Sequence, residues 1–105
     1  MLHHAASRGD TATVRQLVAS KANIQGVDRS QRTALHLAAL QGHPATIQTL
    51  LEAPGVEINA VDVDQRSPLH LAALGSHGQA FQRLMASGAD LKPDKDGSVA
   101  LDLVP

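Results

Sequence analysis

The chain has 105 residues, of which 43% are hydrophobic and 18% charged, and this composition is typical of one small folded domain. Its net charge of −1 and its single aromatic residue, Phe81, argue against binding to nucleic acid through charge or base stacking. The chain contains no cysteine, which excludes disulfides, thiolate chemistry and cysteine-ligated zinc.

Three segments of the chain repeat one another. Residues 2–10 read LHHAASRGD, residues 33–43 read TALHLAALQGH, and residues 67–77 read SPLHLAALGSH. The first two are offset by 33 residues and the last two by 34. Each is followed by a second similar segment, at residues 17–24, 50–58 and 84–91. A fixed period of this length predicts stacked structural repeats.

Each unit is expected to form a helix, a turn, a second helix and an extended loop. In the second unit, Gly42 ends an alanine-rich first helix, because glycine accepts the left-handed conformation of a C-cap. Pro44 begins the second helix, where its fixed φ and missing N–H do no harm. Ile47, Leu50 and Leu51 are spaced to form one apolar stripe. One such unit cannot bury both helices alone, so the units must stack.

The T-A-L-H-L-A-A and S-P-L-H-L-A-A segments, their period, and S-G-A-D-L at residues 87–91 resemble ankyrin repeats over essentially the whole chain. The resemblance implies an all-α solenoid of stacked helix–turn–helix units joined by β-hairpin-like loops. We expect a single array over residues 1–105. Its units are expected at about 1–28, 29–62 and 63–95, with a partial capping unit at 96–105.

Two features depart from the family pattern. Gln31 and Gln65 stand in hairpin turns where the family usually has glycine, and only Gly97 fits that pattern. In the third unit, the sequence from Gly75 to Gly78 shifts the glycine between the two helices away from its usual place. These changes could alter the local turn geometry without threatening the fold.

The core is expected to be aliphatic, since the chain has so few aromatic residues. A cavity created by Leu50→Ala is expected to cost about 2–5 kcal/mol. Because a short array has little stability in reserve, that loss could unfold it. The predicted core residues are Leu2, Ala5, Val14, Leu17, Val18, Leu35, Leu37, Ala38, Ile47, Leu50, Leu51, Leu69, Leu71, Ala72, Phe81, Leu84 and Met85.

The histidines raise the possibility of a metal site, but their spacing favours a structural role. His36 and His70 occupy equivalent positions, and stacking places such residues about 10 Å apart, too far to share one ion. The resemblance implies that each hydrogen-bonds locally, near Thr33 or Ser67, and holds its hairpin against the helix. A structural role is also expected for the histidines that follow the first helices, His43 and His77.

No catalytic site or cofactor is expected. Ser67, His70 and Asp62 are the residue types of a hydrolase, but the first two are explained as parts of the scaffold, and known catalytic motifs are missing. Acidic pairs in the loops, such as Asp62 and Asp64, offer too few oxygen ligands for calcium. These aspartates are expected to form turns instead.

Partners of this family are usually held by the hairpin tips and the exposed face of the first helix. Carried over to this sequence, these positions combine aliphatic residues with arginines, which suits an interface. A competing interpretation is that the valines only stabilise extended loop arms. Further positions of the same kind are Ser7, Gly75, Asp94, Lys95 and Ser98. The predicted partner-binding residues are Arg8, Val27, Arg29, Ser30, Arg32, Leu40, Gln41, Val61, Val63, Asp64, Arg66 and Leu74.

The leading interpretation is a protein–protein interaction module that docks a peptide or folded partner carrying acidic and apolar residues. One alternative is a regulatory or targeting segment of a larger enzyme, channel or effector, packed against its own chain. A mainly structural spacer is a third. The apolar residues Leu2, Ala5 and Ala6 also predict possible self-association through an uncapped N-terminal end.

The sequence gives no sign of a membrane protein or of secretion. Its apolar runs are too short to cross a bilayer, and residues 1–6 lack the pattern of a signal peptide. We therefore expect no membrane insertion. The family resemblance implies an intracellular location, in the cytoplasm or nucleus.

Overall fold

The structure is a computed structural model that describes residues 2–20, 24, 26–53, 55–90, 93 and 97. These residues form six helices and no strand. None of the helices has the length and apolar character needed to span a bilayer in this described part. The helices are α1 (Leu2–Arg8), α2 (Thr11–Ala19), α3 (Ala34–Gln41), α4 (Pro44–Leu51), α5 (Pro68–Leu74) and α6 (Gly78–Ala86).

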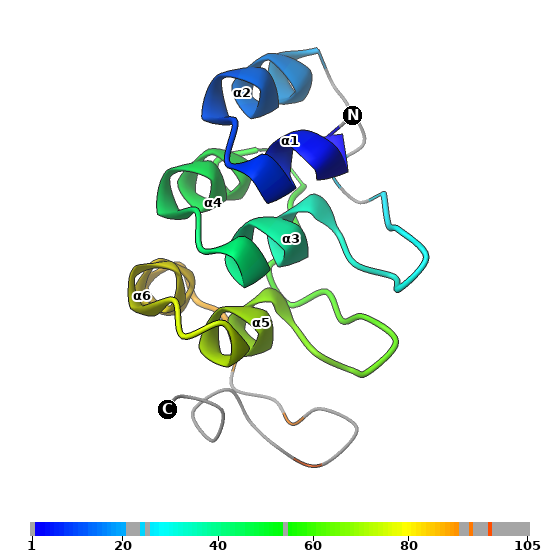
Figure 1. The fold of residues 1–105 in the computed structure, drawn as a ribbon, viewed down its shortest axis with the longest axis vertical. Coiled ribbons are helices and arrows are strands. Elements are labelled where there is room, and N and C mark those ends of the chain that lie inside the picture. Colours follow the sequence, from blue (N-terminus) through cyan, green and yellow to red (C-terminus); the bar gives the residue numbers. More distant parts are fainter. Residues whose placement is uncertain are drawn as a thin grey trace.

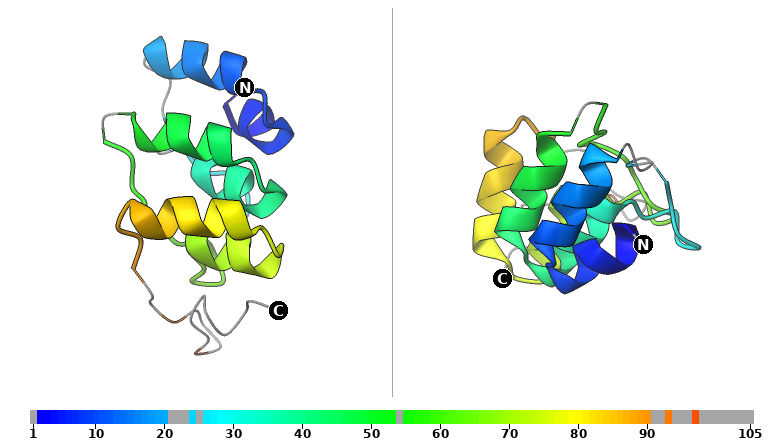
Figure 2. Two further views of the ribbon diagram at one scale, coloured as in Figure 1. Left: turned by 90° about the vertical axis from the view of Figure 1, so that its left-hand side faces the viewer. Right: turned by 90° about the horizontal axis from the view of Figure 1, so that it is seen from above.

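The helices are arranged in two layers that run along the stack (Figure 1). In one layer α1 packs on α3 and α3 on α5, while in the other α2 packs on α4 and α4 on α6. Figure 2 shows the same layers from the side and from above, with the loops before α3 and α5 projecting beyond the first layer. This arrangement confirms the predicted all-α solenoid.

The predicted partial unit at residues 96–105 lies outside the described residues, except for Gly97. Gly97 has φ 80°, as a glycine in a hairpin turn of this family is expected to have. The candidate positions at Asp94, Lys95 and Ser98 also lie outside the described part of the chain.

The turn between the two helices of a unit depends on one left-handed residue. Gly42 has φ 74° at the C-cap of α3, and a Cβ atom there would overlap the imidazole ring of His77 from the next unit. In the third unit, Gly75 keeps φ −82°, and Ser76 takes φ 61° at the position equivalent to Gly42. The same backbone hydrogen bond closes both turns at 3.0 Å. The shifted glycine therefore leaves the turn intact and places a serine in the left-handed region.

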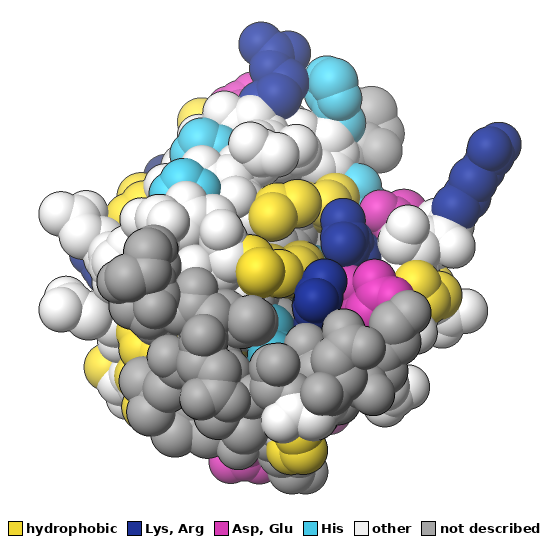
Figure 3. Space-filling view, turned by 60° about the horizontal axis from the view of Figure 1, so that its bottom comes forward, with side chains coloured by type: hydrophobic (Ala, Val, Ile, Leu, Met, Phe, Trp, Pro, Cys, Tyr) yellow, Lys and Arg dark blue, Asp and Glu magenta, His cyan; other side chains and the backbone are white. Residues whose placement is uncertain are grey.

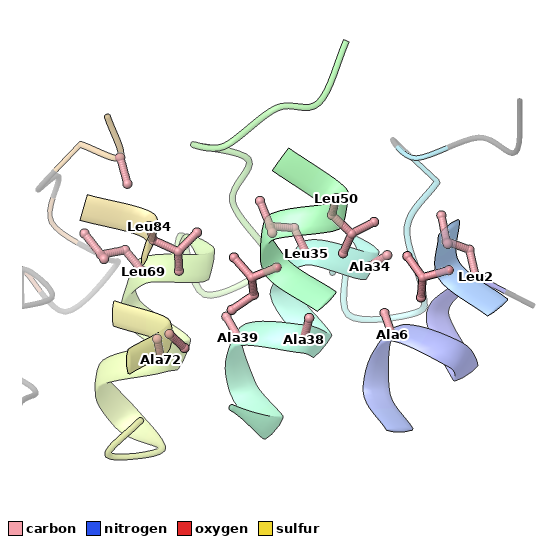
Figure 4. Close-up of a cluster of buried hydrophobic side chains, with 14 of the residues drawn as sticks. Leu2, Ala6, Ala34, Leu35, Ala38, Ala39, Leu50, Leu69, Ala72 and Leu84 are labelled. Carbon is pink, nitrogen blue, oxygen red and sulfur yellow. The ribbon is translucent and has the colours of Figure 1, made fainter. Parts of the chain in front are cut away.

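Apolar side chains from both layers meet in one core (Figure 4). The small side chains of Ala38 and Ala72 are buried and let the helices of the first layer approach closely. Leu50 and Leu84 are also buried and fill the core from the second layer. Most of the predicted core residues are buried as expected. Those that are only half-buried are Leu17, Val18, Leu37, Leu51 and Phe81.

Met85 was predicted to lie in the core, and this prediction is wrong. Its side chain is 37% exposed. On α6 the buried residues are Ala80 and Leu84, four positions apart and therefore on one face of the helix. Met85 follows Leu84 directly, which places it about 100° around the helix from that face.

The N-terminal end of the stack does not expose the apolar residues from which self-association was predicted. Leu2, Ala5 and Ala6 are all buried, because α1 packs them into the common core against α3. Among the described residues, neither α1 nor α2 contributes a large exposed hydrophobic side chain. Self-association through this end therefore lacks the apolar surface that was its basis.

Candidate functional site

The loops before α3 and α5 are tight turns closed by the same hydrogen bonds. The N–H of Asp28 donates to the carbonyl of Arg32, and the N–H of Gln31 donates to the carbonyl of Asp28, each at 3.0 Å. Gln31 has φ 64°, in the region that usually takes glycine in such turns. The loop over residues 62–66 repeats both bonds, with Gln65 at φ 60°. The two glutamines therefore preserve the turn at the cost of a strained backbone.

The aspartate that begins each turn organises it from within. Oδ1 of Asp62 accepts the N–H groups of Asp64 at 2.8 Å and Arg66 at 3.0 Å. Asp28 accepts the corresponding N–H groups of its own loop. Burial acts to raise the pKa of Asp28, but these two backbone donors, together with nearby positive charge such as that of Arg32, outweigh it and hold the pKa below its ordinary value. The predicted turn-forming role is confirmed for Asp62.

The side chain of Arg32 reaches from its own loop to the next one. Its Nε donates to Oδ2 of Asp62 at 3.1 Å, and the two side chains are 25% and 0% exposed. Close by, the N–H of Val63 donates to the carbonyl of Ser30 at 3.0 Å. An ion pair and a backbone hydrogen bond thus join the two successive loops.

His36 and His70 cap the helices on which they lie. The N–H of Thr33 donates to Nδ1 of His36 at 3.1 Å, and the Thr33 hydroxyl oxygen lies 2.9 Å from the same nitrogen. The N–H of His36 in turn donates to that hydroxyl oxygen at 3.4 Å. Ser67 and His70 repeat these three contacts at 3.2, 3.0 and 3.4 Å. The local hydrogen bonding expected of the two histidines is confirmed.

The same histidine position also connects each first helix to the following loop. Nε2 of His36 donates to the carbonyl of Arg66 at 2.9 Å, and Nε2 of His3 lies 3.1 Å from the carbonyl of Arg32. Because Nδ1 of His36 accepts a backbone N–H, its ring is neutral and carries its proton on Nε2. Burial lowers the pKa of His36, while the Arg66 carbonyl and the charge of Asp62 act in the opposite direction and are outweighed.

His43 and His77 serve contacts between units. Nε2 of His43 lies 3.0 Å from the carbonyl oxygen of Ser7, at the end of α1. A Cβ atom on Gly9 would collide with the His43 ring, and one on Gly42 would collide with the His77 ring. Both histidines therefore have the structural role predicted for them. No group of three or more potential metal ligands occurs among the described residues.

The three residues considered for a hydrolase are used by the scaffold. Ser67 and His70 bond to each other at the start of α5, and both side chains are buried. Asp62 is buried as well, and its two oxygens hold its own loop and Arg32. Each of the three residues therefore has a partner within the scaffold.

The predicted partner-binding residues lie on the loops and at the C-terminal ends of the first-layer helices. Figure 3 shows hydrophobic side chains gathered beside basic and acidic ones between the helices and the loops. Arg8, Arg29 and Gln41 are exposed, while the other polar members are half-buried. We call this set the loop face: Arg8, Val27, Arg29, Ser30, Arg32, Leu40, Gln41, Val61, Val63, Asp64, Arg66 and Leu74. Its binding role stays a prediction.

Most of the large hydrophobic side chains that are exposed in the described residues lie on the loop face. In the described part of the chain, five large hydrophobic side chains are exposed, and four of them belong to the loop face. Val27 and Val63 are the most exposed, at 51% and 56%, and Val61 and Leu74 follow. The exception is Met85 on α6.

The ion pair between Arg32 and Asp62 was not predicted from the sequence. A signal was present, because an aspartate is followed four residues later by an arginine at both 28–32 and 62–66. The repetition could not show that the arginine of one unit pairs with the aspartate of the next. That pairing depends on how closely the loops stack.

The fold agrees with comparisons to known proteins. The family model for ankyrin repeats in three copies matches residues 1–62, and the model for a single ankyrin repeat matches residues 64–96. Osteoclast-stimulating factor 1 of Monopterus albus is 39% identical over 57 residues, which cover 54% of this chain and 27% of that protein. The proteins of the same name from Rattus norvegicus and Danio rerio are 33% identical over 57 residues, with the same coverage.

The chain therefore spans only about a quarter of the length of these curated relatives. The two family models together cover most of this chain. Ankyrin repeats are generally protein-interaction modules. The chain belongs to the ankyrin repeat family.

Proposed function

We propose that the chain is a protein-interaction module that docks a peptide or a folded partner on the loop face. The observation that supports this most directly is the concentration of exposed hydrophobic side chains there, led by Val27 and Val63. Covering apolar surface is favourable by about 25 cal/mol per Å². A partner that buried these side chains would gain that free energy. Isolated exposed aliphatic residues need no explanation, but four on one face do.

The rigidity of the loops supports the same proposal. Each loop is closed by its own aspartate, and the two loops are joined through Arg32, Asp62 and the bond from Val63 to Ser30. A surface held in this way loses little conformational entropy when a partner docks. Binding with little change of shape is therefore expected.

The charges of the loop face indicate a partner that carries acidic residues beside apolar ones. Arg8 and Arg29 are exposed, and a guanidinium group pairs well with a carboxylate. Three of the exposed hydrophobic side chains, Val61, Val63 and Leu74, lie further along the stack. We therefore expect the carboxylates of the partner near Arg8 and Arg29 and its apolar side chains near Val61, Val63 and Leu74.

Selection from a random peptide library displayed on phage, with the wild-type chain as target, tests the proposal. Enriched peptides are expected to contain Asp or Glu beside Leu or Ile. A synthetic copy of such a peptide should shift the backbone amide signals of Val27, Arg29, Val61 and Val63 in NMR spectra. Selection of no peptide, or shifts confined to α2, α4 and α6, would contradict the proposal.

A second candidate function is a regulatory or targeting segment that packs against the rest of a longer chain. The match covers only 27% of each curated relative, so in those proteins the matched region is one part of a longer chain. This observation favours the second candidate. A docking face that normally meets its own chain would leave the separate array self-associating. Sedimentation of the 105-residue chain over a wide concentration range distinguishes the two functions. A monomer throughout favours the first.

We propose no catalytic activity, no cofactor and no binding to nucleic acid for this chain. We propose one array over residues 1–105, with units at about 1–28, 29–62 and 63–95 and a partial unit at 96–105. An intracellular location, in the cytoplasm or nucleus, is part of the same proposal.

A further inference from the structure

We infer that Arg32 acts as a positioning residue, which sets the loop over residues 62–66 against the loop over residues 28–32 and so fixes the spacing of the aliphatic contacts on the loop face. This inference rests on the proposed function for its effect on binding. Its structural part, the coupling of the two loops, stands on the contacts of Arg32 alone.

Arg32 differs from its neighbour Arg29 in its surroundings. Arg29 is exposed at the tip of the loop, whereas the Arg32 side chain is only 25% exposed and directs Nε to Oδ2 of Asp62 at 3.1 Å. Asp62 is fully buried. A buried carboxylate needs compensation by donors and by an opposite charge, so loss of the guanidinium group would leave Oδ2 without this partner.

The carboxylate that Arg32 holds in place also fixes the backbone of the loop over residues 62–66. Its other oxygen, Oδ1, accepts the N–H groups of Asp64 at 2.8 Å and Arg66 at 3.0 Å. Next to these bonds, the N–H of Val63 donates to Ser30 in the neighbouring loop. A carboxylate that turned towards solvent after loss of Arg32 would release these N–H groups together. The loop that presents Val63 would then lose its fixed position.

Amide hydrogen exchange tests the coupling without any ligand. Arg32→Gln removes the charge, and Arg29→Gln makes the same change three residues away at an exposed site. We expect Arg32→Gln to speed exchange of the Asp64 and Arg66 amides by about tenfold, as local opening does, and to leave the core amide of Leu50 unchanged. Arg29→Gln should alter none of the three. Unchanged exchange at Asp64 and Arg66, or an equal rise at Leu50, would overturn the inference.

A double variant identifies the buried carboxylate as the link. Asp62→Asn keeps an oxygen for the loop N–H groups but removes the negative charge that Arg32 compensates. In Arg32→Gln, Asp62→Asn, exchange at Asp64 and Arg66 should return towards the wild-type rate, and the chain should fold even where Arg32→Gln alone does not. A folded double variant that exchanges as fast as Arg32→Gln would overturn the inference.

Binding of the library-selected peptide separates positioning from contact. Arg32→Gln should weaken binding while leaving the salt dependence of the affinity unchanged, because the guanidinium group of Arg32 pairs with Asp62 and not with the peptide. Arg29→Gln should reduce the salt dependence, since that charge faces the peptide. If Arg32→Gln and Arg29→Gln lost salt dependence equally, Arg32 would contact the peptide directly, and its positioning role would be overturned. Failure of the wild-type chain to bind any peptide would contradict the proposed function, and hydrogen exchange would still decide whether Arg32 couples the loops.

Discussion

Nε2 of His36 lies 2.9 Å from the carbonyl oxygen of Arg66, which follows it by 30 residues. The other ring nitrogen, Nδ1, accepts the N–H of Thr33 at 3.1 Å. One neutral imidazole thus caps its own helix and holds the next loop. A proton on Nδ1 would remove the acceptor that Thr33 uses, so the charge state of this ring matters for the fold.

Acid is expected to destabilise the chain through His36. Burial holds the pKa of His36 below its ordinary value of 6.5, so the unfolded chain takes up the proton first as the pH falls. This contribution to stability is complete above about pH 6.5 and is lost as the pH falls from there towards the lowered pKa. Urea unfolding at about pH 7.5 and about pH 5.5 should show the loss, and His36→Gln should make it smaller. His4 is exposed, so His4→Gln is the control. Equal pH dependence of the wild-type chain, His36→Gln and His4→Gln would contradict the prediction.

The strained glutamines should be sites of stabilisation. Gln31 has φ 64° and Gln65 has φ 60°, and a residue with a Cβ atom is unfavourable in that region by about 1–2 kcal/mol. Gln31→Gly and Gln65→Gly should each stabilise the chain by about 1 kcal/mol, after the greater freedom of glycine in the unfolded chain is subtracted. Gln41→Gly, within α3, is expected to destabilise it. Chemical unfolding that gives all three changes the same sign would refute this account of the turns.

Gly75 should tolerate alanine poorly for a reason unrelated to its φ. A Cβ atom there would lie 2.9 Å from the carbonyl oxygen of Leu40 and 2.6 Å from Cδ2 of His77. Gly75→Ala is therefore expected to cost about 1–3 kcal/mol through overpacking. Gly78, at the start of α6, has open space around it, so Gly78→Ala should be neutral or slightly stabilising. Thermal unfolding of the two variants compares them, and similar midpoints would be unexpected.

The observed burial of Leu50 and the exposure of Met85 predict very different costs of truncation. Leu50 is 1% exposed, and Leu50→Ala should cost about 2–5 kcal/mol by leaving a cavity. Met85→Ala should cost less than about 1 kcal/mol, because Met85 is largely outside the core. The free energy of unfolding of each variant, from denaturant titration, checks the contrast. A loss at Met85 as large as at Leu50 would show that α6 packs differently.

Structural features that depend on residues close together in the chain could be predicted from the sequence. The repeats predicted the order of the six helices that lie in the described part of the chain, and Pro44 and Gly42 marked the boundary between two of them. The hydrogen bonding of Thr33 with His36 also followed from its recurrence as Ser67 and His70. These patterns depend on residues a few positions apart, which is why the sequence reveals them.

Features that depend on the neighbouring unit were not predictable in the same way. The pairing of Arg32 with Asp62 arises only when one unit stacks on another. The positive φ of Gln31 is a different case, because hydrogen bonds within its own turn, between Asp28 and Arg32, override the preference of a single residue. Met85 was misplaced because an apolar residue at the edge of a stripe is compatible with either face.

The most direct test of the central claim compares charge reversal on the loop face with the same change on the other layer. Arg29 is exposed on the loop face, and Arg15 is exposed on α2. The affinity of the library-selected peptide should fall about tenfold or more in Arg29→Glu, because like charges then face each other across the interface. Arg15→Glu should bind as the wild type does. Equal affinities for the two variants, or a loss confined to Arg15→Glu, would contradict the assignment of the loop face as the binding surface.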